Sequence, residues 1–376
     1  MSAAWSLGLA WLASELGRDL QRASRAAGGP AALWTASRAG FLAALRAGDD
    51  QASRALAARA AFDRRAAEGW LAEAGITHVG LSEPDYPARL AEIYDPPFGL
   101  FLRGDVPGAL ARLSDGPAVA IVGSRRATVA GRALARSLAG ELAARGAVVV
   151  SGLAHGIDAA AHEGALAAGG TTVAVLGAGV DVPYPRRNRE LAARIRERGL
   201  LASEYWPGTP PAPWRFPARN RIVAGLAHAV AVIEAGRRSG ALITADFALE
   251  QGRPILAVPG WPGAEASAGC NALLRAGAAL LETAEDVVAE LPDQVFAPAR
   301  SAAGPAPAGL AGRVLELLCR EPMRADELAA ALGAEAGQVA AALALLEVDG
   351  HAVRGEGQRF WAGARTAWGE RPAGGD

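Results

Sequence analysis

The sequence contains no lysine, so all 38 of its basic residues are arginines. The absence of lysine excludes Schiff-base catalysis and a phosphate-binding lysine of the Walker type. Acidic and basic residues nearly cancel, with a formal net charge of −1 at pH 7. The whole chain therefore has no general attraction for polyanions, and any site for nucleic acid has to be a local basic patch.

Cysteine and long apolar runs are also scarce. The two cysteines, Cys270 and Cys319, cannot form a disulfide framework or a cysteine-rich zinc site, which is typical of a reducing cytoplasm. The apolar residues 5–12 lack the basic region that precedes a signal peptide. Apolar runs elsewhere, such as residues 222–233, are too short to cross a bilayer. We therefore expect a cytoplasmic protein without a membrane span.

What the sequence does contain is enough material for several domains. Its 376 residues, 51% hydrophobic and 20% charged, are typical of a globular protein with two or three domains. Apolar spacing, glycine and proline predict five parts in order. These are a helical domain (1–75), a core (76–291), a linker rich in Pro, Ala and Gly (292–309), a winged helix of three helices and a hairpin (310–363), and a disordered tail (364–376).

Strand-like and helical patterns alternate in the core. The strand-like runs are residues 119–122, 147–151, 172–176, 200–203, 229–234 and 254–258. Such alternation predicts an α/β fold in which helices cover a parallel sheet and ligands bind beyond the carboxyl ends of the strands. The preceding residues 75–104 contain four prolines, and we expect them to form a connecting segment with one edge strand.

The first of these strands leads into a turn that favours anion binding. Gly123 allows a tight bend, Ser124 supplies a hydroxyl, and Arg125 and Arg126 supply adjacent guanidinium groups. A helical pattern resumes directly afterwards, so the unpaired N–H groups of a helix N-terminus point toward the same place. We expect an anion there, and the two arginines favour a phosphate.

Two common kinds of site are not supported. A dinucleotide cofactor needs three glycines at fixed spacing, and neither the first turn nor Gly177 and Gly179 provide them. His155, Asp158 and His162 lack a further ligand in a recognisable zinc arrangement. We expect His155 and Asp158 to brace the turn after the second strand, and we expect neither a cofactor nor a metal.

Residues 184–221 carry the strongest local signal. This segment has nine arginines against three glutamates, and its five aromatic residues put it well above the chain's 6% aromatic content. Arginines that grip phosphates beside aromatic rings that stack bases are what single-stranded nucleic acid requires. Arg186, Arg189, Arg219 and Arg221 stand near turns or helix starts, and we expect them to face the same edge of the sheet as Arg125.

The winged-helix part differs in charge from this segment. Residues 309–363 contain five arginines and eight carboxylates, and the third predicted helix has no arginine. A protein that reads duplex DNA places base-contacting side chains on that helix. We therefore expect this domain to contact a protein or to regulate the core rather than to bind duplex DNA.

Taken together, the motifs resemble a known family. Residues 75–291 carry VGSRRAT, SGLAHGIDAAAH, VAVLGAGVDVPYPRRN, LASEYWPG, FPARNRIVAGL, EAGRRSGALITADFALEQGR, AVPG and GCNALLRAGA in order, as in the DNA-processing protein A (DprA/Smf) family that they resemble. The resemblance implies an extended Rossmann-like core between a helical domain similar to a sterile alpha motif (SAM) and a winged helix. It further implies a dimeric, non-enzymatic protein that binds single-stranded DNA, protects incoming DNA during natural transformation and loads the recombinase RecA.

The resemblance, together with the positions of the turns, indicates which residues would bind the strand. These are Gly123, Ser124, Arg125, Arg126, Arg186, Asn188, Arg189, Arg219, Asn220, Arg221, Ser239 and Gly240. Many relatives have lysine near residues 186 and 189, whereas the arginines of this chain grip phosphate with a planar fork. The sequence identifies no residue of the dimer surface.

Two other functions stay open. Related folds serve hydrolases that release a base from nucleotides and share a Pro-Gly-Gly-x-Gly-Thr-x-x-Glu motif. Residues 238–244 (RSGALIT) stand at the comparable place and lack the glycine cluster and the glutamate, but a Rossmann-like nucleotide (phosphoribo)hydrolase remains the alternative. A protein-binding adaptor is the third hypothesis, and the arginines and aromatic residues of the core argue against it.

Overall fold

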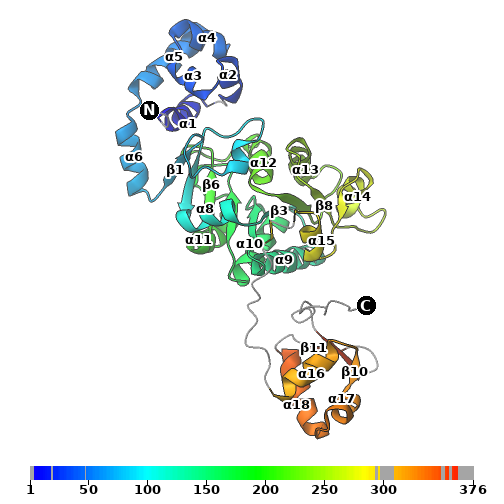
Figure 1. Cartoon of the computed structure of the whole chain (residues 1–376). Helices are drawn as coiled ribbons and strands as arrows, with labels where there is room; N and C mark the ends of the chain where they lie inside the picture. Colours follow the sequence, from blue (N-terminus) through cyan, green and yellow to red (C-terminus); the bar gives the residue numbers. More distant parts are fainter. Residues whose placement is uncertain are drawn as a thin grey trace, which may run out of the picture. The chain divides into compact units, whose positions relative to one another are not determined.

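A computed structural model describes residues 4–17, 20–46, 48–292, 295–296, 309–348, 352–354 and 358–362. These residues fall into two units, one within residues 1–298 and one within residues 299–376, which we describe separately (Figure 1). The expected tail (364–376), most of the expected linker (292–309) and the tip of the expected hairpin lie outside the described residues.

The first unit begins with short helices, as the sequence predicts for residues 1–75. They are α1 (Ala4–Leu16), α2 (Gln21–Ala26), α3 (Pro30–Thr35), α4 (Arg38–Leu45), α5 (Asp49–Ala61) and α6 (Arg64–Glu73). Their apolar faces bury Leu9, Leu12, Leu33 and Phe41 completely in a small core of their own. On α1, Leu7 and Ala10 pack instead into a cluster with Phe101, so these helices also contact the sheet of the same unit.

Within the described residues of the first unit, nine strands form one sheet in the order β1-β2-β6-β5-β4-β3-β7-β8-β9. The strands are β1 (Thr77–Gly80), β2 (Gly99–Gly104), β3 (Ala118–Val122), β4 (Val148–Ser151), β5 (Thr172–Val175), β6 (Leu200–Ser203), β7 (Ala229–Val232), β8 (Ile255–Ala257) and β9 (Ala279–Leu280). Strands β3 to β9 pair in parallel, as expected from the alternating pattern. The order reverses at β3, and in parallel sheets ligands bind beside such a reversal, at the carboxyl ends of the strands.

Helices cover both faces of this sheet (Figure 1). They are α7 (Ala88–Ala91), α8 (Val106–Asp115), α9 (Val129–Ala144), α10 (Ile157–Ala167), α11 (Arg189–Arg198), α12 (Arg215–Leu226), α13 (Gly240–Glu250), α14 (Ala268–Arg275) and α15 (Ala284–Ala289). Strand β3 shows why both faces need cover. Val119 and Ile121 pack with α9, α10 and α15, whereas Ala120 and Val122 pack with α8, α12 and α13. Successive side chains of a strand point to opposite faces, so a strand that is apolar throughout requires helices on both sides.

The segment 75–104 differs from its prediction, because it adds two strands to the sheet rather than one edge strand. Strand β1 is the edge, and β2 lies between β1 and β6 and is antiparallel to both. Phe101 of β2 faces Ser203 of β6, about a hundred positions later in the sequence, and it is fully buried. The prolines lie between the two strands, where they break no ladder hydrogen bond.

The second unit has the arrangement of a winged helix. It contains α16 (Leu310–Leu318), β10 (Met323–Arg324), α17 (Ala325–Leu332), α18 (Ala336–Val348), β11 (Ala352–Arg354) and β12 (Arg359–Ala362), and β12 pairs with both β10 and β11. Val314, Leu328, Val339 and Phe360 are buried in its core. In the part of the chain that the structure describes, no single helix is long and apolar enough to cross a membrane; α17 and α18 pass such a test only as a pair bent by 117°.

Candidate functional site

The turn after β3 is held in place by Glu234, which follows β7. The Ser124 N–H donates to the Glu234 carbonyl (2.6 Å), and the Thr128 N–H (3.1 Å) and Oγ1 (2.8 Å) donate to the Glu234 carboxylate. Thr128 also caps α9, because its Oγ1 accepts from the Gly131 N–H (2.9 Å). Glu234 is 7% exposed. The helix N-terminus that the sequence assigns to an external anion is therefore already occupied by a carboxylate of the same chain.

A cavity of about 440 Å³ lies beside this turn, at the carboxyl ends of β3, β4 and β7. We call this the basic cavity. Its lining includes Gly123, Ser124, Arg125 and Arg126 after β3, Gly152, Ala154 and Asp158 after β4, Phe216, Arg219 and Asn220 of α12, and Arg237, Arg238, Ser239 and Gly240 before α13. Eight of the twelve residues predicted from the sequence thus come together, although they come from three separate parts of the chain.

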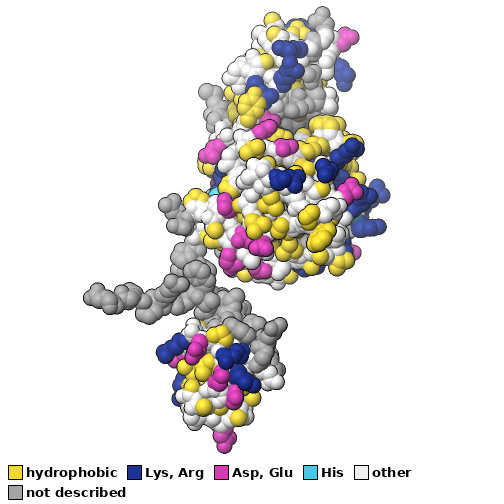
Figure 2. All heavy atoms as spheres, turned by 90° about the vertical axis from the view of Figure 1, so that its right-hand side faces the viewer, with side chains coloured by type: hydrophobic (Ala, Val, Ile, Leu, Met, Phe, Trp, Pro, Cys, Tyr) yellow, Lys and Arg dark blue, Asp and Glu magenta, His cyan; other side chains and the backbone are white. Residues whose placement is uncertain are grey.

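The charge of the basic cavity is strongly positive. Its lining contains five arginines and two carboxylates, Asp158 and Glu265. Four of these arginines are exposed, and they stand in two adjacent pairs, at residues 125–126 and 237–238. On the face drawn in Figure 2, arginines gather along one edge of the core and carboxylates in another region, so the basic charge is local.

Arg237 and Arg238 are missing from the set of residues predicted from the sequence. The signal for them was present, because an arginine pair before a predicted helix start repeats the pattern of Arg125 and Arg126. The prediction took Ser239 and Gly240 from this segment but not the two arginines that precede them. In the structure Ser239 caps α13, and its Oγ accepts from the Ala241 N–H.

Arg219 forms part of the floor of the basic cavity and is only 4% exposed. Its Nη1 donates to the carbonyl oxygens of Gly152 (2.7 Å) and Val175. Burial lowers the pKa of Arg219 to about 10, and burial also raises the pKa of Asp158, although the positive charge of Arg219 opposes that rise. A Cβ atom at Gly152 would lie 2.4 Å from Nη2 of Arg219, so this close approach requires glycine.

Arg221 does not line the basic cavity, contrary to the prediction that it faces the same edge as Arg125. It lines a different pocket, where its guanidinium binds both carboxylate oxygens of Glu204 (2.7 Å each) and lies 3.2 Å from the Asp95 carboxylate. Burial by itself lowers the pKa of Arg221, but the two carboxylates outweigh burial and raise it above its ordinary value. Arg221 is therefore already paired within the chain and has a structural role.

The predicted residues after β5 lie outside the basic cavity but connect with it. Asn188 is buried, and its Nδ2 donates to the carbonyls of residues 153 and 154, which fixes this loop to the turn after β4. Arg186 and Arg189 are exposed on either side of Asn188. Tyr184 of the same loop contacts Phe216 (5.4 Å between ring centroids), and the Arg125 guanidinium lies 5.5 Å from that ring.

Asp158 and His162 have structural roles. The Ala154 N–H donates to the Asp158 carboxylate (3.2 Å), so Asp158 braces the turn after β4 as expected. His162 is fully buried, its Nδ1 lies 2.7 Å from Thr172 Oγ1, and burial lowers its pKa to about 3. Among the described residues no group of three or more His, Cys, Asp or Glu could hold a metal ion.

Comparison with known proteins places this architecture in a family. The family model described as DNA recombination-mediator protein A matches residues 77–292, and the one described as DprA winged helix domain matches residues 298–358. The DNA processing protein DprA of Bacillus subtilis (strain 168) is 41% identical over 222 residues, which cover 59% of this chain and 73% of the relative. The DprA of Streptococcus pneumoniae (strain ATCC BAA-255 / R6) is 46% identical over 209 residues, covering 54% and 71%.

Solved structures agree with this assignment. The crystal structure of DprA from Streptococcus pneumoniae covers 77% of this chain and 96% of its own, with a TM-score of 0.63 and 34% identity. A structure that describes the single-stranded DNA binding mode of DprA from Helicobacter pylori covers 57% and 94%, with a TM-score of 0.51 and 31% identity. Because the first family model alone spans more than half of the sequence, the chain belongs to the DNA recombination-mediator protein A (DprA/Smf) family.

Proposed function

We propose that this chain binds single-stranded DNA in the basic cavity and takes part in DNA processing during natural transformation and recombination. The observation that carries the proposal is the set of four exposed arginines, at residues 125, 126, 237 and 238, around one cavity at the carboxyl edge of the sheet. Guanidinium forks bind phosphate oxygens in pairs, and such contacts do not depend on base sequence. The strand-binding relative from Helicobacter pylori supports the same conclusion.

The geometry suggests how a strand would be held. Phosphates would bind the exposed arginines and the N-terminus of α13 at Ser239 and Gly240, where the helix dipole favours negative charge. Phe216 contacts both Arg125 and Tyr184, and the two rings offer a surface on which a base can stack. Arg186 and Arg189 would extend the positive path beyond the cavity. Binding in this scheme includes no catalytic step.

Membership of the family leads us to propose the remaining features. The chain would work in the cytoplasm as a homodimer, protect incoming strands and deliver them to RecA. The winged helix is the candidate for a protein contact, because its sequence carries more carboxylates than arginines. We also propose that the chain divides after residues 75, 291, 309 and 363 into a helical domain, a core, a linker, a winged helix and a tail.

Salt titration of the Arg125→Ala variant tests the phosphate contact. Removing one phosphate contact should reduce the slope of log affinity against log salt by about 0.7 for a single strand. Arg194→Ala is the matched control, because Arg194 is exposed on α11 and lines no part of the basic cavity. An Arg125→Ala slope equal to that of the wild type and of Arg194→Ala would remove Arg125 from the site.

A further inference from the structure

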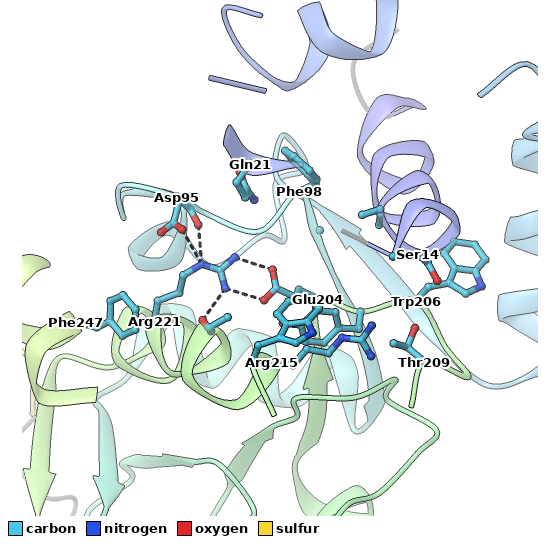
Figure 3. Close-up of a pocket in the computed structure, with 17 residues that line it drawn as sticks. Ser14, Gln21, Asp95, Phe98, Glu204, Trp206, Thr209, Arg215, Arg221 and Phe247 are labelled. Carbon is cyan, nitrogen blue, oxygen red and sulfur yellow. Dashed lines mark hydrogen bonds and ion pairs between the residues drawn. The ribbon is translucent and has the colours of Figure 1, made fainter. Parts of the chain in front are cut away.

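A second cavity, of about 280 Å³, lies between the N-terminal helices and the core of the first unit (Figure 3). We call it the aromatic cavity, because Phe98, Tyr205, Trp206, Trp214 and Phe247 contribute to its wall. Helix α12 separates the two cavities. Trp214, Arg215, Ala218 and Arg221 line the aromatic cavity, whereas Phe216, Pro217, Arg219, Asn220 and Val223 line the basic one.

The charges of the aromatic cavity are balanced within the chain. Its two carboxylates, Asp95 and Glu204, both bind Arg221 at the end of the cavity that Figure 3 draws opposite Thr209. The other lining arginine, Arg215, lies 5.0 Å from the ring centroids of both Tyr205 and Trp214. A ligand of this cavity therefore contacts aromatic rings and polar groups whose charges sum to zero, and such a lining disfavours a strongly charged molecule.

Two polar groups in this wall have no hydrogen-bond partner among the described residues. They are the Oγ1 of Thr209, a residue that is 7% exposed, and the Nε of Arg215. The position of Thr209 is fixed, because its N–H donates to the Trp206 carbonyl (3.1 Å) and its carbonyl accepts from the Gly179 N–H (2.9 Å). Buried polar groups are almost always paired in folded proteins, and an acceptor atom of a ligand in the cavity would satisfy these two.

We propose that the aromatic cavity binds one unpaired nucleobase. A base offers a flat π-face for Trp214 and Tyr205, together with ring nitrogens and carbonyls that accept from Thr209 and Arg215. The volume lies just below the range of roughly 300–1,000 Å³ for small-molecule pockets, which suits a single base better than several nucleotides. Trp206 forms a firm back wall, because it stacks on Trp70 (6.2 Å) and contacts Phe101 edge-on (5.3 Å).

The base can come from a bound strand or from a free nucleoside. The first source rests on the proposed function, because it requires a strand in the basic cavity. Arg215 and Phe216 are neighbours at the start of α12, and they line the aromatic and the basic cavity respectively. A strand that crosses the start of this helix would place a phosphate against Arg125 and a base against Trp214. The second source needs no contact with the basic cavity.

A cycle of two proteins and two oligonucleotides tests the proposal. Wild type and Trp214→Ala are titrated with an oligothymidylate and with an abasic strand of the same length. We expect the substitution to weaken oligothymidylate binding by about 5- to 150-fold, the effect of removing one base stack, and abasic binding by less than about twofold. Trp261→Ala is the matched control, because Trp261 is 81% exposed and lines neither cavity.

The outcomes separate this proposal from the function of the basic cavity. Arg125→Ala should weaken binding of both strands by the same factor. A different result would contradict phosphate binding in the basic cavity and would not affect the proposed base site. If Trp214→Ala weakens binding of the two strands equally, or weakens neither, the proposed base site is wrong. The aromatic cavity would then be a candidate site for an aromatic side chain of a protein partner. Thr209→Val, which replaces the unpaired hydroxyl with a methyl group, should weaken binding of the oligothymidylate and leave binding of the abasic strand unchanged.

Free thymidine distinguishes the two sources of the base. Saturable quenching of tryptophan fluorescence in the wild type that disappears in Trp214→Ala would show that the cavity accepts a free nucleoside. A positive oligonucleotide cycle without such quenching would show that the base is delivered by a strand. Thermal unfolding of each variant confirms that the first unit remains folded, because Trp214 is already 48% exposed in the wild type.

Discussion

Replacing Arg221 with methionine should destabilise the protein without removing a phosphate contact. The Arg221 side chain is 5% exposed and binds Glu204, whose side chain is 16% exposed, and Asp95, whose side chain is 31% exposed. Removal of one partner from a buried ion pair leaves the other charge without compensation and typically costs about 3–5 kcal/mol. Because Asp95 is partly in water, we expect the lower end, about 3 kcal/mol. For a unit that spans residues 1–298 that loss lowers the melting temperature by roughly 5 °C, since the unfolding entropy is about 2.1 cal/mol/K per residue.

The assay is thermal unfolding followed by tryptophan fluorescence, together with a strand titration at a temperature where the variant is folded. The double variant Arg221→Met/Glu204→Leu should recover part of the loss, since it removes both buried charges. Arg194→Met on the exposed face of α11 is the control and should leave the melting temperature unchanged. A stable Arg221→Met variant with impaired strand affinity would show that Arg221 binds phosphate and that our assignment is wrong.

The structure leads to three further predictions. Gly152→Ala should displace the Arg219 guanidinium, because the new Cβ would lie 2.4 Å from Nη2. We expect the free energy of unfolding to fall by about 1–3 kcal/mol and strand binding to weaken, and unchanged stability and affinity would contradict this. His162 is kept neutral by burial, which lowers its pKa from 6.5 to about 3, so its contribution to stability is present above pH 6.5 and is lost as the unfolded chain takes up a proton at lower pH. The difference in unfolding free energy between wild type and His162→Gln should therefore shrink by about 1.4 kcal/mol per pH unit below pH 6, as measured by urea denaturation, and a constant difference would refute it. Deletion of residues 310–376 should leave affinity for single-stranded oligonucleotides unchanged in a gel-shift titration, and a large loss would assign strand binding to the winged helix.

Much of the fold was predictable from local pattern. Strands β3 to β8 are short apolar runs between turns and helical patterns, and both faces of such a run must be buried, so the parallel sheet followed directly. Strand β2 was not predictable in this way. Its partner β6 lies about a hundred residues later, and the antiparallel ladder that it forms has no local signature.

The candidate site shows the same limit at the level of single residues. Arg125, Arg126, Ser239 and Gly240 follow strand ends, and parallel strands end at one edge, so their meeting in the basic cavity was foreseeable. Arg219 and Arg221 were grouped because they are close in sequence. Two residues that are two positions apart on a helix point about 200° apart, and in the structure one lines the basic cavity and the other lines the aromatic cavity.

The sequence by itself determined which groups this chain can offer: arginine forks, aromatic rings and helix starts at the ends of parallel strands. Tertiary structure alone decided which of them remain available to a ligand. Glu234 occupies the N-terminus of α9, Glu204 and Asp95 pair with Arg221, and backbone carbonyls hold Arg219. The physical reason is that a charge removed from water must be paired inside the protein, and the partner that pairs it comes from another element of the fold, which no local pattern can identify.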